Sequence, residues 1–192
     1  SPPSLAQIVE VARAKALKIH IDGARVFNAA AACGTTVSEF GRQVDSISFC
    51  LSKGLGAPVG SVLCGSQAFI HRAHRFRKML GGGMRQAGIL AAAGLYALEH
   101  HIPDLAVDNR RAQVLAYALA EMKYVDLDPA SVHSNIVVFK VPSRQPAAVC
   151  EALAPWVRVL PFGPRKIRAV LHRDIDDIGV SAAIDGFASQ LN

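Results

Sequence analysis

The chain has 192 residues, of which 51% are hydrophobic and 19% are charged, and a formal net charge of +6. This length suits one large or two small domains with a sizeable core, and the basic balance permits an anionic ligand without specifying one. The longest apolar run, 87–98, is shorter than the roughly eighteen residues of a membrane helix, and the chain begins without a recognisable secretory signal. We therefore expect no membrane association. The four cysteines have no C-x-x-C spacing, so we expect reduced thiols, no metal site and a cytoplasmic location.

The first 40 residues predict short alternating elements. Apolar residues recur with a helical period after Ser4, which can cap a helix, and Gly34 is a suitable stop for an alanine-rich helix. In chain order we expect a helix over 4–17, a strand over 18–22, a helix over 26–33 and a helical turn over 36–40.

A single lysine stands in a turn between two predicted strands. Alternating apolar residues predict a strand over 46–51, and a second apolar run predicts another over 62–64. Lys53 lies in the intervening turn, between small residues. Partial desolvation there would lower the pKa of its amine and favour a nucleophile that forms a Schiff base. A solvated loop lysine is the alternative, and this stretch alone does not decide between them.

A carboxylate upstream of this lysine favours the first interpretation. Asp22 ends a predicted strand 31 residues before Lys53, which leaves room for one helix between two neighbouring parallel strands. Both side chains would then emerge at the carboxyl edge of one sheet, where open α/β sheets bind ligands. Pyridoxal phosphate requires this pair, because a lysine holds its aldehyde and a carboxylate keeps its ring nitrogen protonated.

Three motifs resemble those of the low-specificity threonine aldolases, which are fold-type I pyridoxal phosphate enzymes. In the family's order they are Asp22-Gly-Ala-Arg25, Leu51-Ser-Lys53-Gly-Leu-Gly-Ala-Pro-Val-Gly-Ser61 and Leu80-Gly-Gly-Gly-Met-Arg-Gln86. The resemblance runs along most of the chain and implies an α/β fold. Residues 1–105 would form the C-terminal part of a large cofactor-binding domain with a mostly parallel sheet, and residues 106–192 a helix and a small α+β domain.

The resemblance also implies an activity and a set of site residues. The family cleaves L-threonine or L-allo-threonine to glycine and acetaldehyde by retro-aldol chemistry, and its members are homo-oligomers, so we expect a dimer or tetramer and no nucleic-acid partner. The implied catalytic residues are Lys53, Asp22 and Arg25. The implied cofactor-binding residues are Lys53, Asp22, Lys78 and Arg85, and the implied substrate-binding residues are Arg25 and Arg168.

Residues 69–80 form a basic run that is the main support for a nucleic-acid alternative, since such proteins neutralise phosphates with lysine and arginine. No recognised nucleic-acid module surrounds the run, and a solvated face is its commonest interpretation. In the family, the residues matching Lys78 and Arg85 enter the cofactor site, in part across a subunit interface. Glycines 81–83 lead into a helix expected to begin near Met84, whose start could bind a phosphate or carboxylate.

The C-terminal part of the chain predicts two long helices and then a small α+β domain. The expected helices cover 84–100, 102–122, 146–154 and 174–191, and the expected strands cover 134–141 and 168–172. Arg168 matches a family arginine that opens a strand running into Thr-His, and its guanidinium suits a bidentate contact with the substrate carboxylate. Here Leu171 replaces the threonine.

The family's phosphate-binding Gly-Thr loop and ring-stacking histidine, both in its N-terminal half, have no counterpart here, so the chain resembles the C-terminal part of the enzyme. No residue can be assigned as the base that removes the β-hydroxyl proton. Two alternatives therefore stay open: a truncated, non-catalytic relative, and a related fold-type I pyridoxal phosphate lyase.

Overall fold

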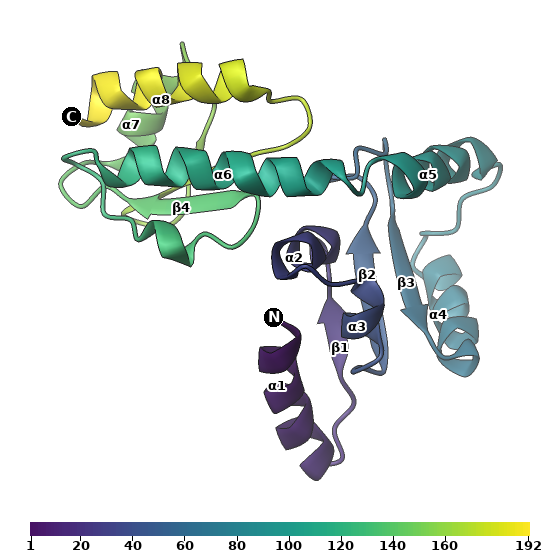
Figure 1. Ribbon diagram of the computed structural model, residues 1–192. Helices are drawn as coiled ribbons and strands as arrows, with labels where there is room; N and C mark the ends of the chain where they lie inside the picture. Colours follow the sequence, from purple (N-terminus) through teal and green to yellow (C-terminus); the bar gives the residue numbers. More distant parts are fainter. The chain divides into compact units, whose positions relative to one another are not determined.

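The computed structural model describes residues 1–192 and divides into two compact units, 1–103 and 104–192 (Figure 1). Each unit has its own three-stranded sheet. No helix of the chain is both long enough and apolar enough to cross a membrane. The expected boundary at 105/106 falls just inside the helix with which the second unit begins.

The first unit alternates helices and short strands. In chain order these are α1 (Pro2–Ala14), β1 (His20–Asp22), α2 (Val26–Cys33), α3 (Val37–Gly41), β2 (Ser46–Cys50), β3 (Ser61–Gly65), α4 (Gln67–Met79) and α5 (Gly88–His100). The predicted helices before residue 45 are present. The first begins earlier than expected, because the Ser1 side chain accepts a hydrogen bond from the Ser4 backbone N–H and caps it.

The sheet of the first unit has the order β1-β2-β3. Strands β1 and β2 are parallel, with Asp22 opposite Ser48, as predicted for the strands that lead to Asp22 and Lys53. Strand β3 is antiparallel to β2 because the short turn over 51–60 reverses the chain directly, whereas a parallel strand needs a longer crossover. On one face of the sheet, Ile47 packs against Val26 and Ala30 of α2 and Phe40 of α3, and these four residues form the core of the first unit.

Two helices follow the sheet, and the second begins later than predicted. The basic run over 69–80 is mostly helix α4, which Ser66 caps by accepting a hydrogen bond from the Phe69 N–H. The next helix begins at Gly88 and not near Met84. Gln86 has a φ of 49°, in the left-handed region, and this interrupts helical geometry before α5.

The second unit is the expected small α+β domain. Its elements are α6 (Asp104–Ala120), the 3₁₀ turn η1 (Pro129–Ser131), β4 (Ile136–Lys140), α7 (Pro146–Leu153), β5 (Leu160–Pro161), β6 (Lys166–Val170) and α8 (Asp177–Leu191). The sheet order is β4-β6-β5, with antiparallel neighbours, and the two-residue strand β5 was not predicted. Alternate residues of β4 and β6 are buried in one core with the helices, where the rings of Phe139 and Phe187 meet edge to face.

Candidate active site

Asp22 and Lys53 follow neighbouring parallel strands at the same carboxyl edge. Asp22 is the last residue of β1, and Lys53 lies in the turn directly after β2. The Gly23 N–H donates to the Ser48 carbonyl at 2.8 Å, which continues the strand pairing past Asp22. Both charged side chains are exposed and have no hydrogen-bond or ion-pair partner within the chain. A carboxylate and an amine are thus available at one edge of the sheet.

Backbone hydrogen bonds define the turn that presents Lys53. The Gly56 N–H donates to the Lys53 carbonyl at 2.8 Å, and the Ala57 N–H donates to the Leu51 carbonyl at 3.0 Å. Leu55 is only 2% exposed and anchors the turn. The expectation that Lys53 is partly desolvated is wrong for this chain, because Leu55 packs inward while Lys53 stays exposed.

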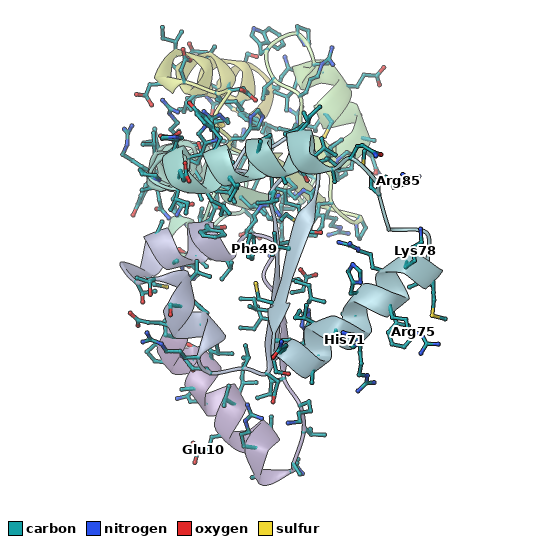
Figure 2. The ribbon with its side chains drawn as sticks, turned by 90° about the vertical axis from the view of Figure 1, so that its right-hand side faces the viewer. Glu10, Phe49, His71, Arg75, Lys78 and Arg85 are labelled. Carbon is teal, nitrogen blue, oxygen red and sulfur yellow. The ribbon has the colours of Figure 1, made fainter.

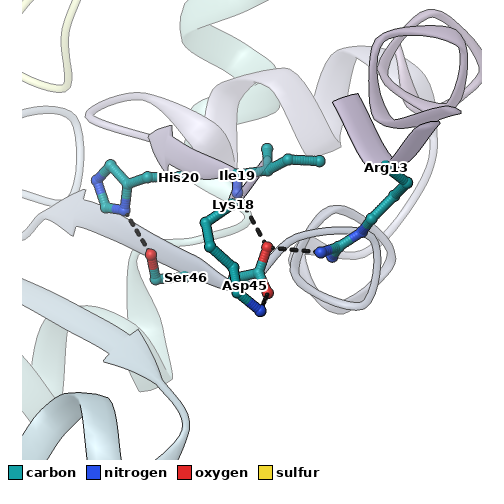
Figure 3. Close-up of polar contacts among 6 residues, drawn as sticks. All are labelled: Arg13, Lys18, Ile19, His20, Asp45 and Ser46. Carbon is teal, nitrogen blue, oxygen red and sulfur yellow. Dashed lines mark hydrogen bonds and ion pairs between the residues drawn. The ribbon is translucent and has the colours of Figure 1, made fainter. Parts of the chain in front are cut away.

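A polar cluster at the opposite ends of the strands fixes their register (Figure 3). The Asp45 carboxylate accepts hydrogen bonds from the Ile19 backbone N–H at 2.9 Å, from Arg13 at 2.9 Å and from Lys18 at 3.1 Å. The hydrogen bond from Ile19, followed by that from Lys18, lowers the pKa of Asp45. This cluster ties the start of β1 to the start of β2, and so sets where Asp22 and Lys53 emerge.

Arg25 stands beside the same edge. It occupies the N-terminal cap position of α2, where its φ of −131° is outside the helical range, and its side chain is half-buried. The short connection therefore places Arg25 only three residues beyond Asp22, at the end of β1.

Lys78 and Arg85 lie on either side of the glycine turn (Figure 2). Lys78 is in the last turn of α4, and a Cβ added at Gly83 would come 3.0 Å from its Cδ, so the turn folds closely over this side chain. The Gly82 N–H donates to the Arg77 carbonyl at 2.8 Å, which holds the turn against the helix. Lys78 and Arg85 are exposed and without partners, and the structure does not bring either of them into contact with Asp22 or Lys53.

Arg168 belongs to the second unit, on strand β6. Its neighbours Ile167 and Ala169 point into the core, so Arg168 lies on the other face of the sheet. Its guanidinium is 5.5 Å from the centre of the Phe162 ring, and its Nε is buried without a hydrogen-bond partner in the chain. A buried donor of this kind is suited to a carboxylate acceptor.

Helix α4 presents its basic residues on its exposed sides, while Ile70 and Ala73 are partly buried. The exposed basic residues are His71, Arg72, His74, Arg75, Arg77 and Lys78. No group of three or more side chains suited to a metal ion occurs in the chain. The run is therefore an exposed helix surface that ends next to the glycine turn.

Sequence reasoning missed two residues that shape this edge. Asp45 carries no motif, and its three donors become its neighbours only when β1 and β2 pair. His101, just after α5, contacts the Leu55 carbonyl from 46 residues away, and no local pattern signals this contact.

A family model described as Beta-eliminating lyase matches residues 1–142, well over half of the chain. The chain belongs to this family. Compared with curated relatives, the chain is 49% identical over 131 residues to low-specificity L-threonine aldolase 1 of Arabidopsis thaliana. The match covers 68% of this chain and 37% of the relative. The chain is 42% identical over 166 residues to the low specificity L-threonine aldolase of Escherichia coli (strain K12), covering 86% and 49%. The predicted resemblance to the threonine aldolases is confirmed.

Solved structures show the same fold. A threonine aldolase of Leishmania major matches with a TM-score of 0.73 at 16% identity, covering 96% of this chain and 55% of that one. A serine palmitoyltransferase of Sphingomonas wittichii matches with a TM-score of 0.72 at 18% identity, covering 99% and 50%. This family member therefore has the predicted α/β fold of the fold-type I pyridoxal phosphate enzymes. The chain spans about half the length of curated relatives that it matches.

Proposed function

We propose that this chain functions in a pyridoxal phosphate-dependent lyase that cleaves L-threonine and L-allo-threonine to glycine and acetaldehyde. The observation that carries the proposal is the placement of Asp22 and Lys53 at the same carboxyl edge of two adjacent parallel strands. The names of the relatives support the substrate class.

The residues at this edge fit the cofactor. The Asp22 carboxylate is free to hold a protonated ring nitrogen, and the Lys53 amine is free to bind the aldehyde carbon, since neither has a partner in the chain. Lys78 and Arg85 are not in contact with Asp22 or Lys53 in the chain; in this proposal they would supply positive charge for the phosphate, beside the backbone N–H groups of the glycine turn. When bound, pyridoxal phosphate takes up the electron pair released as the Cα–Cβ bond of the substrate breaks.

Two arginines are suited to the α-carboxylate of the substrate. Arg25 follows Asp22 by three residues and is the N-cap of α2. Arg168 offers a buried Nε–H without an acceptor, on a guanidinium next to the Phe162 ring. Holding the carboxylate limits rotation of the amino acid, and catalysis requires the breaking bond to stay in one orientation.

We further propose a homo-oligomer, a dimer or tetramer, in a cytoplasmic location. Large apolar side chains are exposed around the end of α4 and the start of α5, and an oligomer interface would cover them. They are Phe76, Met79, Leu80, Met84 and Ile89. The four cysteines are all free thiols, which favours a reducing compartment.

The test of the proposed function is the identity of the lysine that binds the cofactor. Pyridoxal phosphate is added to the full-length enzyme, the mixture is reduced with borohydride, and labelled peptides are identified by mass spectrometry. We expect label on the peptide with Lys53, loss of that label in Lys53→Ala, and normal labelling in the matched control Lys15→Ala, which alters another exposed lysine of the first unit. Label on a different lysine would refute the assignment.

A second candidate is a non-catalytic relative, favoured by the coverage of only about half of the relatives' length. Acetaldehyde release from L-allo-threonine distinguishes the two. We expect the 192-residue chain alone to be a poor enzyme even with excess cofactor, because rigid positioning of the ring needs more contacts than Asp22, Lys53, Lys78 and Arg85 provide. Turnover equal to that of a full-length relative would contradict this expectation.

A further inference from the structure

The end of helix α5 holds the turn that carries Lys53. His101, at the C-terminal cap of α5, contacts the carbonyl oxygen of Leu55 through its Nδ1 at 2.6 Å. Because a carbonyl oxygen can only accept, the Nδ1 atom carries a proton and donates in this contact. Leu55 is 2% exposed, so water is poorly placed to replace this donor.

Helix α5 meets the same turn at a second point, about two helical turns earlier. A Cβ added at Gly94 would come 3.0 Å from Leu51 Cδ1, so this glycine lets the helix approach the beginning of the turn. Ala97, between the two contacts, is 1% exposed. Gly94, Ala97 and His101 share one helix face by their spacing. This face contacts Leu51, which precedes Lys53 in the chain, and Leu55, which follows it.

A neighbouring ring holds the imidazole from another side. The Tyr96 and His101 rings meet edge to face, with centroids 5.3 Å apart. Tyr96 thus limits rotation of the imidazole, while the Leu55 carbonyl sets where its Nδ1 must lie.

We propose that His101 is a positioning residue for Lys53. Its hydrogen bond fixes Leu55, two positions beyond the lysine, and therefore the backbone from which the Lys53 side chain projects. This inference rests on the proposed function, in which the Lys53 amine reacts. Misplacement of a reacting group by about 1 Å can cost a hundredfold in rate, so a residue that fixes the turn contributes to the reaction without touching the substrate.

Three variants isolate the hydrogen bond. His101→Phe keeps an aromatic ring beside Tyr96 and removes the donor. His101→Asn is the conservative variant, because its amide N–H stands the same number of bonds from the backbone as the imidazole Nδ1. His100→Phe is the matched control, since this neighbouring imidazole is exposed and has no hydrogen bond to the turn. Its ring also contacts Tyr96, with centroids 4.3 Å apart, and phenylalanine keeps a ring there as it does at position 101.

The first measurement is independent of cofactor and activity. Hydrogen exchange of the Gly56 and Ala57 amides, which donate within the Lys53 turn, is followed in the 192-residue chain. We expect exchange about tenfold faster in His101→Phe, from loss of one buried hydrogen bond, and near-normal exchange in His101→Asn and His100→Phe. Unchanged protection in His101→Phe would overturn the inference.

The second measurement concerns the reaction in the full-length enzyme. We expect His101→Phe to lower kcat about tenfold or more with KM within about twofold of normal, and His101→Asn to restore kcat. Faster exchange with an unchanged kcat would show that His101 stabilises the turn but does not position Lys53, and would overturn the inference. If the parent enzyme neither labels Lys53 nor turns over, the proposed function fails, while the exchange experiment still decides whether His101 holds the turn.

Discussion

Replacing Gly23 with alanine should separate the two strands that present Asp22 and Lys53. A Cβ at this position would lie 2.7 Å from the Ser48 carbonyl oxygen, 3.1 Å from Val26 Cβ and 3.3 Å from Ile47 Cδ1. The closest of these atoms belongs to the backbone of β2 and cannot rotate away. The same Ser48 oxygen accepts the Gly23 N–H at 2.8 Å, so relieving the clash stretches this hydrogen bond.

The expected cost follows from these two effects. Overpacking a buried site typically costs about 1–3 kcal/mol, and a weakened hydrogen bond adds up to about 1 kcal/mol, so we expect Gly23→Ala to lower the free energy of unfolding of the first unit by about 2 kcal/mol or more. Gly88→Ala is the matched control. A Cβ at Gly88 meets nothing within 4 Å, and alanine favours the helix that begins there, so this variant should be neutral or slightly stabilising.

Urea unfolding of the 192-residue chain is the assay. Far-UV circular dichroism reports both units, whereas Trp156, the only tryptophan, reports the second unit and serves as an internal reference. Gly23→Ala should destabilise the circular dichroism transition and leave the tryptophan transition nearly unchanged. A variant within about 0.5 kcal/mol of the parent chain would refute the reasoning, because it would show that β1 and β2 are not in close contact at Gly23.

Three further changes test charges and cofactor binding. Burial raises the pKa of Asp108, so its ionisation destabilises the second unit as the pH rises above the usual carboxyl range. Asp108→Asn should therefore raise the melting temperature measured by Trp156 fluorescence at about pH 7, but not at pH 3. Backbone and lysine hydrogen bonds lower the pKa of Asp45, so its contribution to the stability of the first unit is present at neutral pH and lost in acid. Asp45→Asn should lower the melting temperature measured by far-UV circular dichroism at about pH 7, and much less at pH 3. Neutralising Lys78 and Arg85 should weaken retention of pyridoxal phosphate in dialysis, whereas a salt-sensitive affinity for DNA that disappears with them would instead favour nucleic-acid binding.

Local sequence determined the strand–turn–strand around Lys53, the strand that ends at Asp22 and most of the helices. These elements depend on residue spacing and turn chemistry within short windows, so a pattern of alternating apolar residues or a glycine stop is sufficient to predict them. The spacing between Asp22 and Lys53 also predicted a parallel strand pair, because the intervening length suits one crossover helix. The roles of both residues, and of Arg25, Lys78, Arg85 and Arg168, stay predictions.

Only the tertiary structure decided how the turn and its strands are held. The exposure of Lys53 depends on where Leu55 packs, and the start of α5 depends on the left-handed backbone at Gln86. Asp45 meets its donors only once the strands pair, and His101 reaches the Leu55 carbonyl across 46 positions. Such contacts join segments far apart in the chain, and their geometry follows from the packing of whole elements, which residue spacing within one segment does not record.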